Sequence, residues 1–109
     1  MSLLLTAWLI LIASILLEVL GMLFLKHANG LTNLWPSVGG ISCFLLSIWT
    51  FSISLKTIEM GITYAVWAAA STAIVAIIGI QFYAESASLF KLIGIALIII
   101  GVALLNLST

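Results

Sequence analysis

The chain has 109 residues, of which 65% are hydrophobic and 6% are charged, and its formal net charge is zero. Soluble domains average about 25% charged residues, and so short a chain has too much surface for its volume to hide this apolar content from water. The composition predicts a protein of the lipid bilayer. It argues against nucleic acid as a partner, and the single cysteine, Cys43, excludes an internal disulfide and a cysteine-based metal site. We expect neither a metal nor another cofactor.

Four apolar segments have the length and composition of membrane-spanning helices, which need roughly 20 residues. The first is expected to remain as a helix and not to be cleaved as a signal peptide, because no lysine or arginine precedes its apolar run. Gly30 is expected to follow it in a positive-φ conformation. The short connections predict one all-α domain over residues 1–109, an up-and-down four-helix bundle. The expected spans are 3–25, 35–55, 61–83 and 92–107.

The lysines give the bundle almost no preferred orientation. One lysine lies at each of the three connections, namely Lys26, Lys56 and Lys91, and short-loop lysines normally mark the cytoplasmic side. Two interpretations stay open. The chain inserts in both orientations, which makes an antiparallel dimer of one gene product possible, or the lysines are interface anchors and another signal sets the topology.

Glu18 is the one acidic residue inside an expected span. On membrane-insertion scales, an acidic residue at the centre of a spanning helix costs about 2.5–3.5 kcal/mol of insertion free energy. No basic residue lies inside another expected span, and Lys26 is about 12 Å further along the same helix. An apolar environment favours the protonated form of a carboxyl group, and a proton that leaves when a cation arrives describes a proton-coupled cation site. A purely structural role is the alternative.

The neighbours of Glu18 favour an organic cation. Leu11 and Ser14 share its helix face, and the small Ser14 would let a ligand approach the acid. Tyr64 and Trp67 lie three residues apart in the third span, and aromatic faces near a carboxylate suit a large, weakly hydrated cation. The alternative for either aromatic residue, considered by itself, is that it packs against other helices and does not bind a cation.

Gly94 and Gly101 are seven residues apart and therefore share one face of the fourth span. Small residues let helices approach closely in lipid. The face with these two glycines is expected to form either a dimer contact or a close contact within the protomer, and the sequence leaves both open.

An ordered set of motifs runs through the chain: EVLG with Glu18, LKHANG, LWPS, ITYAVW, and IGIALIIIGV before LLNL. On these motifs the chain resembles the small multidrug resistance family over nearly its whole length. The resemblance implies an antiparallel homodimer in the inner (plasma) membrane that is not an enzyme but a proton-coupled antiporter of organic cations. Two copies of Glu18 would bind protons or one cation in mutual exclusion, and alternating access would carry the cation outward.

The family pattern also implies which residues do this. Gly94 and Gly101 would form the dimer seam. Gly21 and Asn106 stand where guanidinium exporters of the family carry Trp and Lys, which favours the quaternary-ammonium and hydrophobic-cation type. The residues implied to line the proton and substrate site are Trp8, Leu11, Ser14, Glu18, Phe44, Tyr64 and Trp67.

The chain departs from the family pattern at two places. Ala69 and Ser71 replace a usual Gly-x-Gly in the third span, and small residues bend a helix less readily than glycine. Phe44 replaces a usual tyrosine. Export of another cationic metabolite, such as a polyamine or a guanidinium-like compound, is therefore an alternative, as is a role as half of a heteromeric pair with a paralogous subunit.

Two further classes stay as alternatives. In a non-transporting membrane subunit, Glu18 would only specify assembly. A translocator of lipids or lipid-linked sugars would need basic residues for a phosphate headgroup, and the expected spans hold none. A soluble-type enzyme is not expected, because the chain offers no pair of nucleophile and base.

Overall fold

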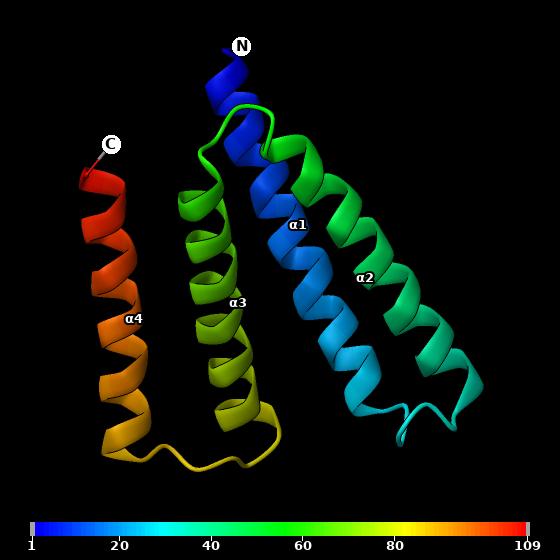
Figure 1. Ribbon diagram of the computed structural model, residues 1–109. Coiled ribbons are helices and arrows are strands. Elements are labelled where there is room, and N and C mark those ends of the chain that lie inside the picture. The colour runs from blue at the N-terminus through cyan, green and yellow to red at the C-terminus, as the bar shows by residue number, and fades with distance from the viewer. Residues whose placement is uncertain (1, 109) are drawn as a thin grey trace. The chain divides into compact units, whose positions relative to one another are not determined.

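The computed structural model describes residues 2–108 and consists of four helices (Figure 1). Each helix is long and apolar enough to cross a membrane, and no strand occurs in this described range. The predicted fold class, an all-α protein with four membrane spans, is confirmed. The helices are α1 (Leu3–Lys26), α2 (Leu34–Ser54), α3 (Met60–Phe82) and α4 (Leu89–Leu107).

The fourth helix begins earlier than the expected start at residue 92. Ser88 is its N-cap: the Ser88 Oγ accepts a hydrogen bond from the Lys91 N–H at 3.2 Å. A serine at this position satisfies one of the N–H groups that the first turn of a helix leaves without a partner. Leu89, Phe90 and Lys91 therefore form the first turn of α4, although the lysine suggests a connection when the sequence is read for hydropathy alone.

The connection between α1 and α2 contains a short left-handed segment. Gly30 has φ +69°, as predicted, and it is flanked by Asn29 at φ 50° and Leu31 at φ 70°. The Asn33 N–H donates to the Ala28 carbonyl at 3.0 Å and closes the turn. Three successive residues with positive φ reverse the chain direction within the few residues that separate the two helices.

The chain forms two compact units, Met1–Glu59 and Met60–Thr109. The first is the hairpin of α1 and α2, and the second is the hairpin of α3 and α4. Figure 1 shows that the two helices of each hairpin run antiparallel. That all four helices form a single domain remains a prediction.

Small residues recur every seventh position on α1 and on α2, and they face one another along the hairpin. A seven-residue step brings a helix back to nearly the same face after two turns. Because the helices are antiparallel, the first of these residues on α1 faces the last one on α2, and the last on α1 faces the first on α2. We call this set of residues the α1–α2 seam: Ala7, Ser14, Gly21, Gly40, Ser47 and Ser54.

Hydrogen bonds and close backbone contact hold the seam. Ser54 Oγ donates to the Ala7 carbonyl oxygen at 2.8 Å. Ser14 and Ser47 each donate from the side-chain hydroxyl to the backbone carbonyl of the other, both at 2.8 Å. These three serines are fully buried. Within a membrane, where lipid is as apolar as the side chains, such contacts are what drives helices together.

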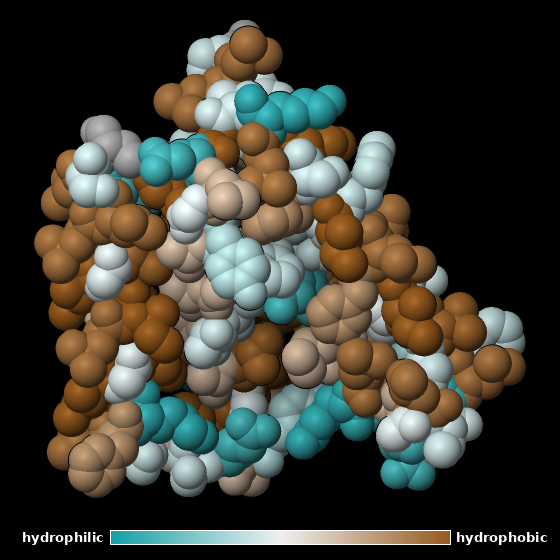
Figure 2. Space-filling model, viewed as in Figure 1, coloured by the Kyte–Doolittle hydropathy of each residue, from teal (hydrophilic) through white to brown (hydrophobic). Residues whose placement is uncertain are grey.

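The surface of α4 differs from that of α1 and α2. No residue of α4, all of which lie in the described range, is buried. In Figure 2 the visible surface over α4 is almost continuously apolar between polar ends. An apolar band with polar ends is the surface expected of a helix that faces lipid or another apolar helix.

Candidate functional site

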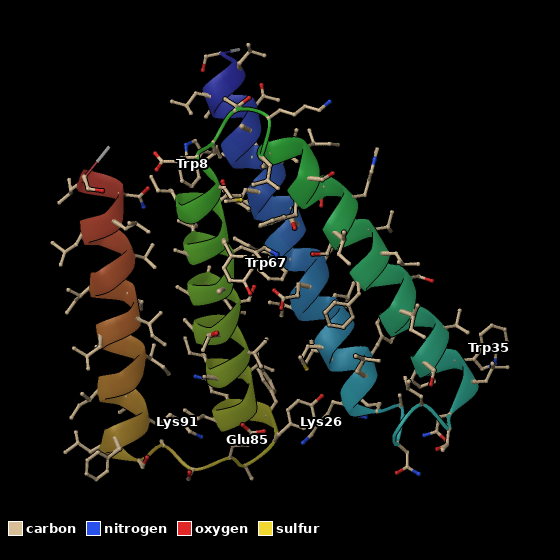
Figure 3. The ribbon with its side chains drawn as sticks, in the orientation of Figure 1. Trp8, Lys26, Trp35, Trp67, Glu85 and Lys91 are labelled. Carbon is tan, nitrogen blue, oxygen red and sulfur yellow. The ribbon has the colours of Figure 1, made fainter. Side chains whose placement is uncertain are left out.

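One face of α1 carries four of the predicted site residues. Trp8, Leu11, Ser14 and Glu18 follow one another at steps of three or four residues, which places them on the same side of the helix. Glu18 and Trp8 are half-buried, whereas Leu11 and Ser14 are fully buried. Figure 3 shows Trp8 near the N-terminal end of this helix.

Glu18 is the only carboxyl group that the sequence places within a helix. The other two acids, Glu59 and Glu85, lie in the connections that follow α2 and α3. The lysines also lie at or beyond helix ends, and Figure 3 shows Lys26 at the end of α1 and Lys91 at the start of α4. Glu18 is thus the single acidic group at membrane depth, where charged residues usually serve a functional site.

Ser14 lies in the α1–α2 seam, where its hydroxyl donates to the Ser47 carbonyl and its Oγ lies 3.1 Å from Ser47 Oγ. In this conformation the Ser14 hydroxyl donates its proton to a hydrogen bond with α2. That its small size lets a ligand approach Glu18 stays a prediction.

Phe44 of α2 lies against the turn of α1 that follows Glu18. A Cβ built on Gly21 would lie 3.1 Å from Phe44 Cδ2 and 3.2 Å from Cys43 Cβ. The missing side chain of Gly21 is therefore what lets the Phe44 ring approach α1. Because Gly21 is three residues after Glu18, the ring is brought beside the turn that carries the acid.

Tyr64 and Trp67 lie together on α3. Their ring centroids are 5.8 Å apart and the rings are tilted by 50°. Tyr64 is 60% exposed, and Trp67 is half-buried. Two neighbouring rings of this kind offer a cation more than one π face, an arrangement used in proteins that bind quaternary ammonium groups.

Helices α3 and α4 carry the small residues that the sequence analysis connected with helix bending and with the dimer contact. Helix α3 is continuous from Met60 to Phe82, and Ala69 and Ser71 are buried within it. On α4, no described residue lies within 4 Å of a Cβ built on Gly94 or on Gly101. Both glycines thus present open space to whatever packs on this face.

Sequence reasoning missed the part of the seam that lies on α2. The predicted site residues did not include Gly40, Ser47 or Ser54. Ser47 nevertheless contacts Ser14, in the turn of α1 that precedes Glu18. A signal was available: glycine or serine occurs at every seventh position from Gly40, and alanine, serine and glycine recur at the same spacing from Ala7. Hydrogen bonds across the pair could not be read from this spacing alone.

Each hairpin carries side chains of a kind that can attract an organic cation. Within residues 2–108, no three His, Cys, Asp or Glu side chains lie close enough together to hold a metal ion. What the helices do offer is one carboxyl group at membrane depth on α1 and a pair of aromatic rings on α3. A carboxylate and π faces attract a cation without the several oxygen or nitrogen ligands that a metal requires.

Comparison with known proteins gives one family. The family described as Small Multidrug Resistance protein matches residues 6–98. The chain is 38% identical over 99 residues to the Quaternary ammonium compound-resistance protein QacG of Staphylococcus sp. (strain ST94), covering 91% of this chain and 92% of that protein. It is 37% identical over 94 residues to the Multidrug transporter EmrE of Escherichia coli (strain K12), covering 86% of each. It is 38% identical over 103 residues to a Guanidinium exporter of Citrobacter freundii, covering 94% of this chain and 98% of the relative.

Proposed function

Since the chain belongs to the small multidrug resistance family, we propose that it exports hydrophobic or quaternary-ammonium cations across the inner membrane in exchange for protons. The observation that carries this proposal is the position of Glu18, the only carboxyl group within the four spanning helices. Relatives named as a resistance protein, a multidrug transporter and a guanidinium exporter support the transport of cations. We expect no catalytic activity.

Proton and substrate would compete for the same carboxyl group. In a dimer, two copies of Glu18 would face one cavity, and each carboxyl group would hold a proton or help to bind one cation. The doubly protonated pair and the cation-loaded pair are both close to electrical neutrality, but the empty, doubly ionised pair is not. Because charge is expensive within a bilayer, the empty pair is disfavoured, and the protein exchanges one ligand for the other instead of leaking.

The same proposal assigns roles to the remaining predicted residues. Tyr64 and Trp67 would bind the cation through their rings, and Phe44 would limit the space beside Glu18. Trp8 and Leu11 would support the acid from the same helix face. Access would alternate between the two sides of the membrane as the two protomers exchange conformations.

The partner would be a second, inverted copy of the chain. Two lysines at the outer connections and one at the middle connection give little bias for one orientation. The unburied, glycine-bearing face of α4 offers the surface on which the copies would meet. A paralogous subunit is the alternative partner, and export by the purified chain alone would exclude a strict need for it.

Proton release on substrate binding tests the proposal. Purified protein in detergent, at mildly alkaline pH and in weak buffer, is mixed with tetraphenylphosphonium while the pH is recorded. We expect proton release that disappears in Glu18→Gln and persists in Glu59→Gln, which neutralises an acid outside the helices. Binding without Glu18-dependent release would remove the exchange mechanism.

Guanidinium, added in the same assay, separates the two substrate types. Export of guanidinium has support from the guanidinium exporters among the relatives. Release with guanidinium and not with tetraphenylphosphonium would assign the chain to that type. A Glu18→Gln protein that still confers resistance in cells would favour a role in assembly instead of transport.

A further inference from the structure

We infer that Ser14 and Ser47 act as a pair of positioning residues for Glu18, because they hold the backbone turn of α1 from which the Glu18 side chain extends. This inference rests on the proposed role of Glu18. It gives Ser14 a task other than contact with substrate, and it gives a role to Ser47, which the sequence analysis did not single out.

The pair is closed by reciprocal hydrogen bonds. Ser14 Oγ donates to the Ser47 carbonyl and Ser47 Oγ donates to the Ser14 carbonyl, each at 2.8 Å. Thr50 Oγ1 also donates to the Ser47 carbonyl, at 3.0 Å. Ser14 and Ser47 are both fully buried, so water does not compete for these bonds. The two helices are thus fixed to each other at this level.

The Ser14 carbonyl connects the pair to Glu18. In an α-helix each carbonyl accepts the N–H of the residue four positions later, so the Ser14 carbonyl is the acceptor for the backbone N–H of Glu18. Ser47 Oγ donates to that same oxygen. Side chains on a helix also reach back toward its N-terminus, which places the Glu18 side chain over the turn that contains Ser14. The hydroxyl of Ser47 therefore holds the backbone on which the carboxyl group is mounted.

The other charged groups of the hairpin lie away from the level of the serine pair. Helix α2 carries no Asp, Glu, Lys, Arg or His, and its one titratable side chain is Cys43. On α1 the other charged side chain is Lys26, two turns beyond Glu18 at the helix end. The serine pair acts on the backbone of α1 one turn before Glu18.

The seam itself supplies a matched control. Ser54 Oγ donates to the Ala7 carbonyl at 2.8 Å, and Ser54 is as fully buried as Ser47. By the helix pattern, the Ala7 carbonyl accepts the N–H of Leu11 and not that of Glu18. Ser54→Ala and Ser47→Ala thus remove the same kind of bond between the same two helices, at two levels seven residues apart.

Amide hydrogen exchange measured by NMR on the full-length protein tests whether the pair holds Glu18. We expect Ser14→Ala and Ser47→Ala to raise the exchange rate of the Glu18 amide by about three- to tenfold, the range that one ordinary hydrogen bond allows. Ser54→Ala should raise the rate at Leu11 and leave the Glu18 rate unchanged. Equal acceleration at Glu18 in all three variants, or none in Ser14→Ala, would overturn the inference.

Substrate binding tests whether this holding matters for function. In the proton-release assay, Ser14→Ala and Ser47→Ala should weaken tetraphenylphosphonium affinity by about three- to tenfold, and Ser54→Ala should match the wild type. Loss in Ser47→Ala alone would make Ser47 a direct ligand, and the paired role would be wrong. Faster exchange with unchanged affinity would also overturn it.

The wild-type protein distinguishes failure of the inference from failure of the proposed function. Wild type that neither binds tetraphenylphosphonium or guanidinium nor releases protons removes the proposed function, and the inference with it. Wild type that binds and releases, beside serine variants with the same affinity, leaves the function in place and removes only the role of the pair.

Discussion

Gly40 of α2 packs closely against Leu25 and Gly21 of the facing helix. A Cβ built on Gly40 would meet the Gly21 carbonyl oxygen at 3.2 Å and Leu25 Cδ2 at 2.8 Å. At this level of the seam, the backbone of α2 lies against both the Leu25 side chain and the Gly21 carbonyl of α1, and a side chain at position 40 would have no free space. In lipid such close packing is a main source of helix association.

Gly40→Ala should therefore force the two helices apart. We expect the free energy of unfolding to fall by about 1–3 kcal/mol, the usual effect of overpacking, because the Leu25 side chain must change its conformation and the Gly21 carbonyl cannot move without its helix. Unfolding by sodium dodecyl sulfate in mixed micelles measures the change. Gly39→Ala is the control: its Cβ would meet only the ring of Phe24, at 3.1 Å, and that partly exposed ring can turn aside. Equal losses would contradict the backbone contact at Gly40.

Trp67→Ala should weaken cation binding. The substitution removes one of two rings whose centroids are 5.8 Å apart. A cation–π contact is worth about 0.5–2 kcal/mol, which corresponds to about 2- to 30-fold in affinity. Titration with tetraphenylphosphonium measures it. Trp35→Ala removes a tryptophan that is 78% exposed at the start of α2 and should leave the affinity unchanged. If both variants bind like the wild type, the rings do not form the site.

Gly94→Leu and Gly101→Leu test the open face of α4. A Cβ built at either position meets no atom within 4 Å outside its chain neighbours and its own helix backbone, so we expect the larger side chain to leave the folded protomer intact. If a second copy packs on this face, leucine should block it, and cross-linking in vesicles should show more monomer. Ala96→Leu adds similar bulk to a residue nearly opposite on the same helix. Dimers that survive both glycine changes would place the interface elsewhere.

Gly30→Ala isolates the effect of backbone conformation. Gly30 has φ +69°, and no described atom lies within 4 Å of its added Cβ, so only the left-handed backbone opposes the change. We expect a loss of about 1–2 kcal/mol in the free energy of unfolding. Gly61→Ala also enters open space, but at an ordinary φ, and should be neutral or slightly stabilising. A neutral Gly30→Ala would mean that the connection readjusts at no cost.

Much of the fold could be predicted because length and apolar content decide which segments cross a bilayer. Three of the helices begin and end within one residue of the expected spans. The start of α4 was placed late, because the hydrogen bond from the Lys91 N–H to Ser88 Oγ decides where the helix begins, and hydropathy carries no information on that bond. Gly30 was predicted correctly, since its conformation depends on the residue itself.

The candidate site was predicted less completely. A single acid in an apolar span identifies Glu18, and helical spacing groups its neighbours. Spacing on one helix does not show what a side chain contacts on another, so the bonds of Ser14 to α2 were not predicted and Ser47 was missed. The bond between them joins residues 33 positions apart, and only the packing of α1 against α2 brings them together.

The hydrogen bonds of the first hairpin also bear on how the chain enters the membrane. Helix α2 is the less apolar of the two, yet its hydroxyls at Ser37, Ser47, Thr50, Ser52 and Ser54 donate to carbonyls of their own chain. Lipid leaves such groups no other partner. Two of these carbonyls, at Ser14 and Ala7, belong to α1, so α1 supplies acceptors within the membrane for the hydroxyls of Ser47 and Ser54.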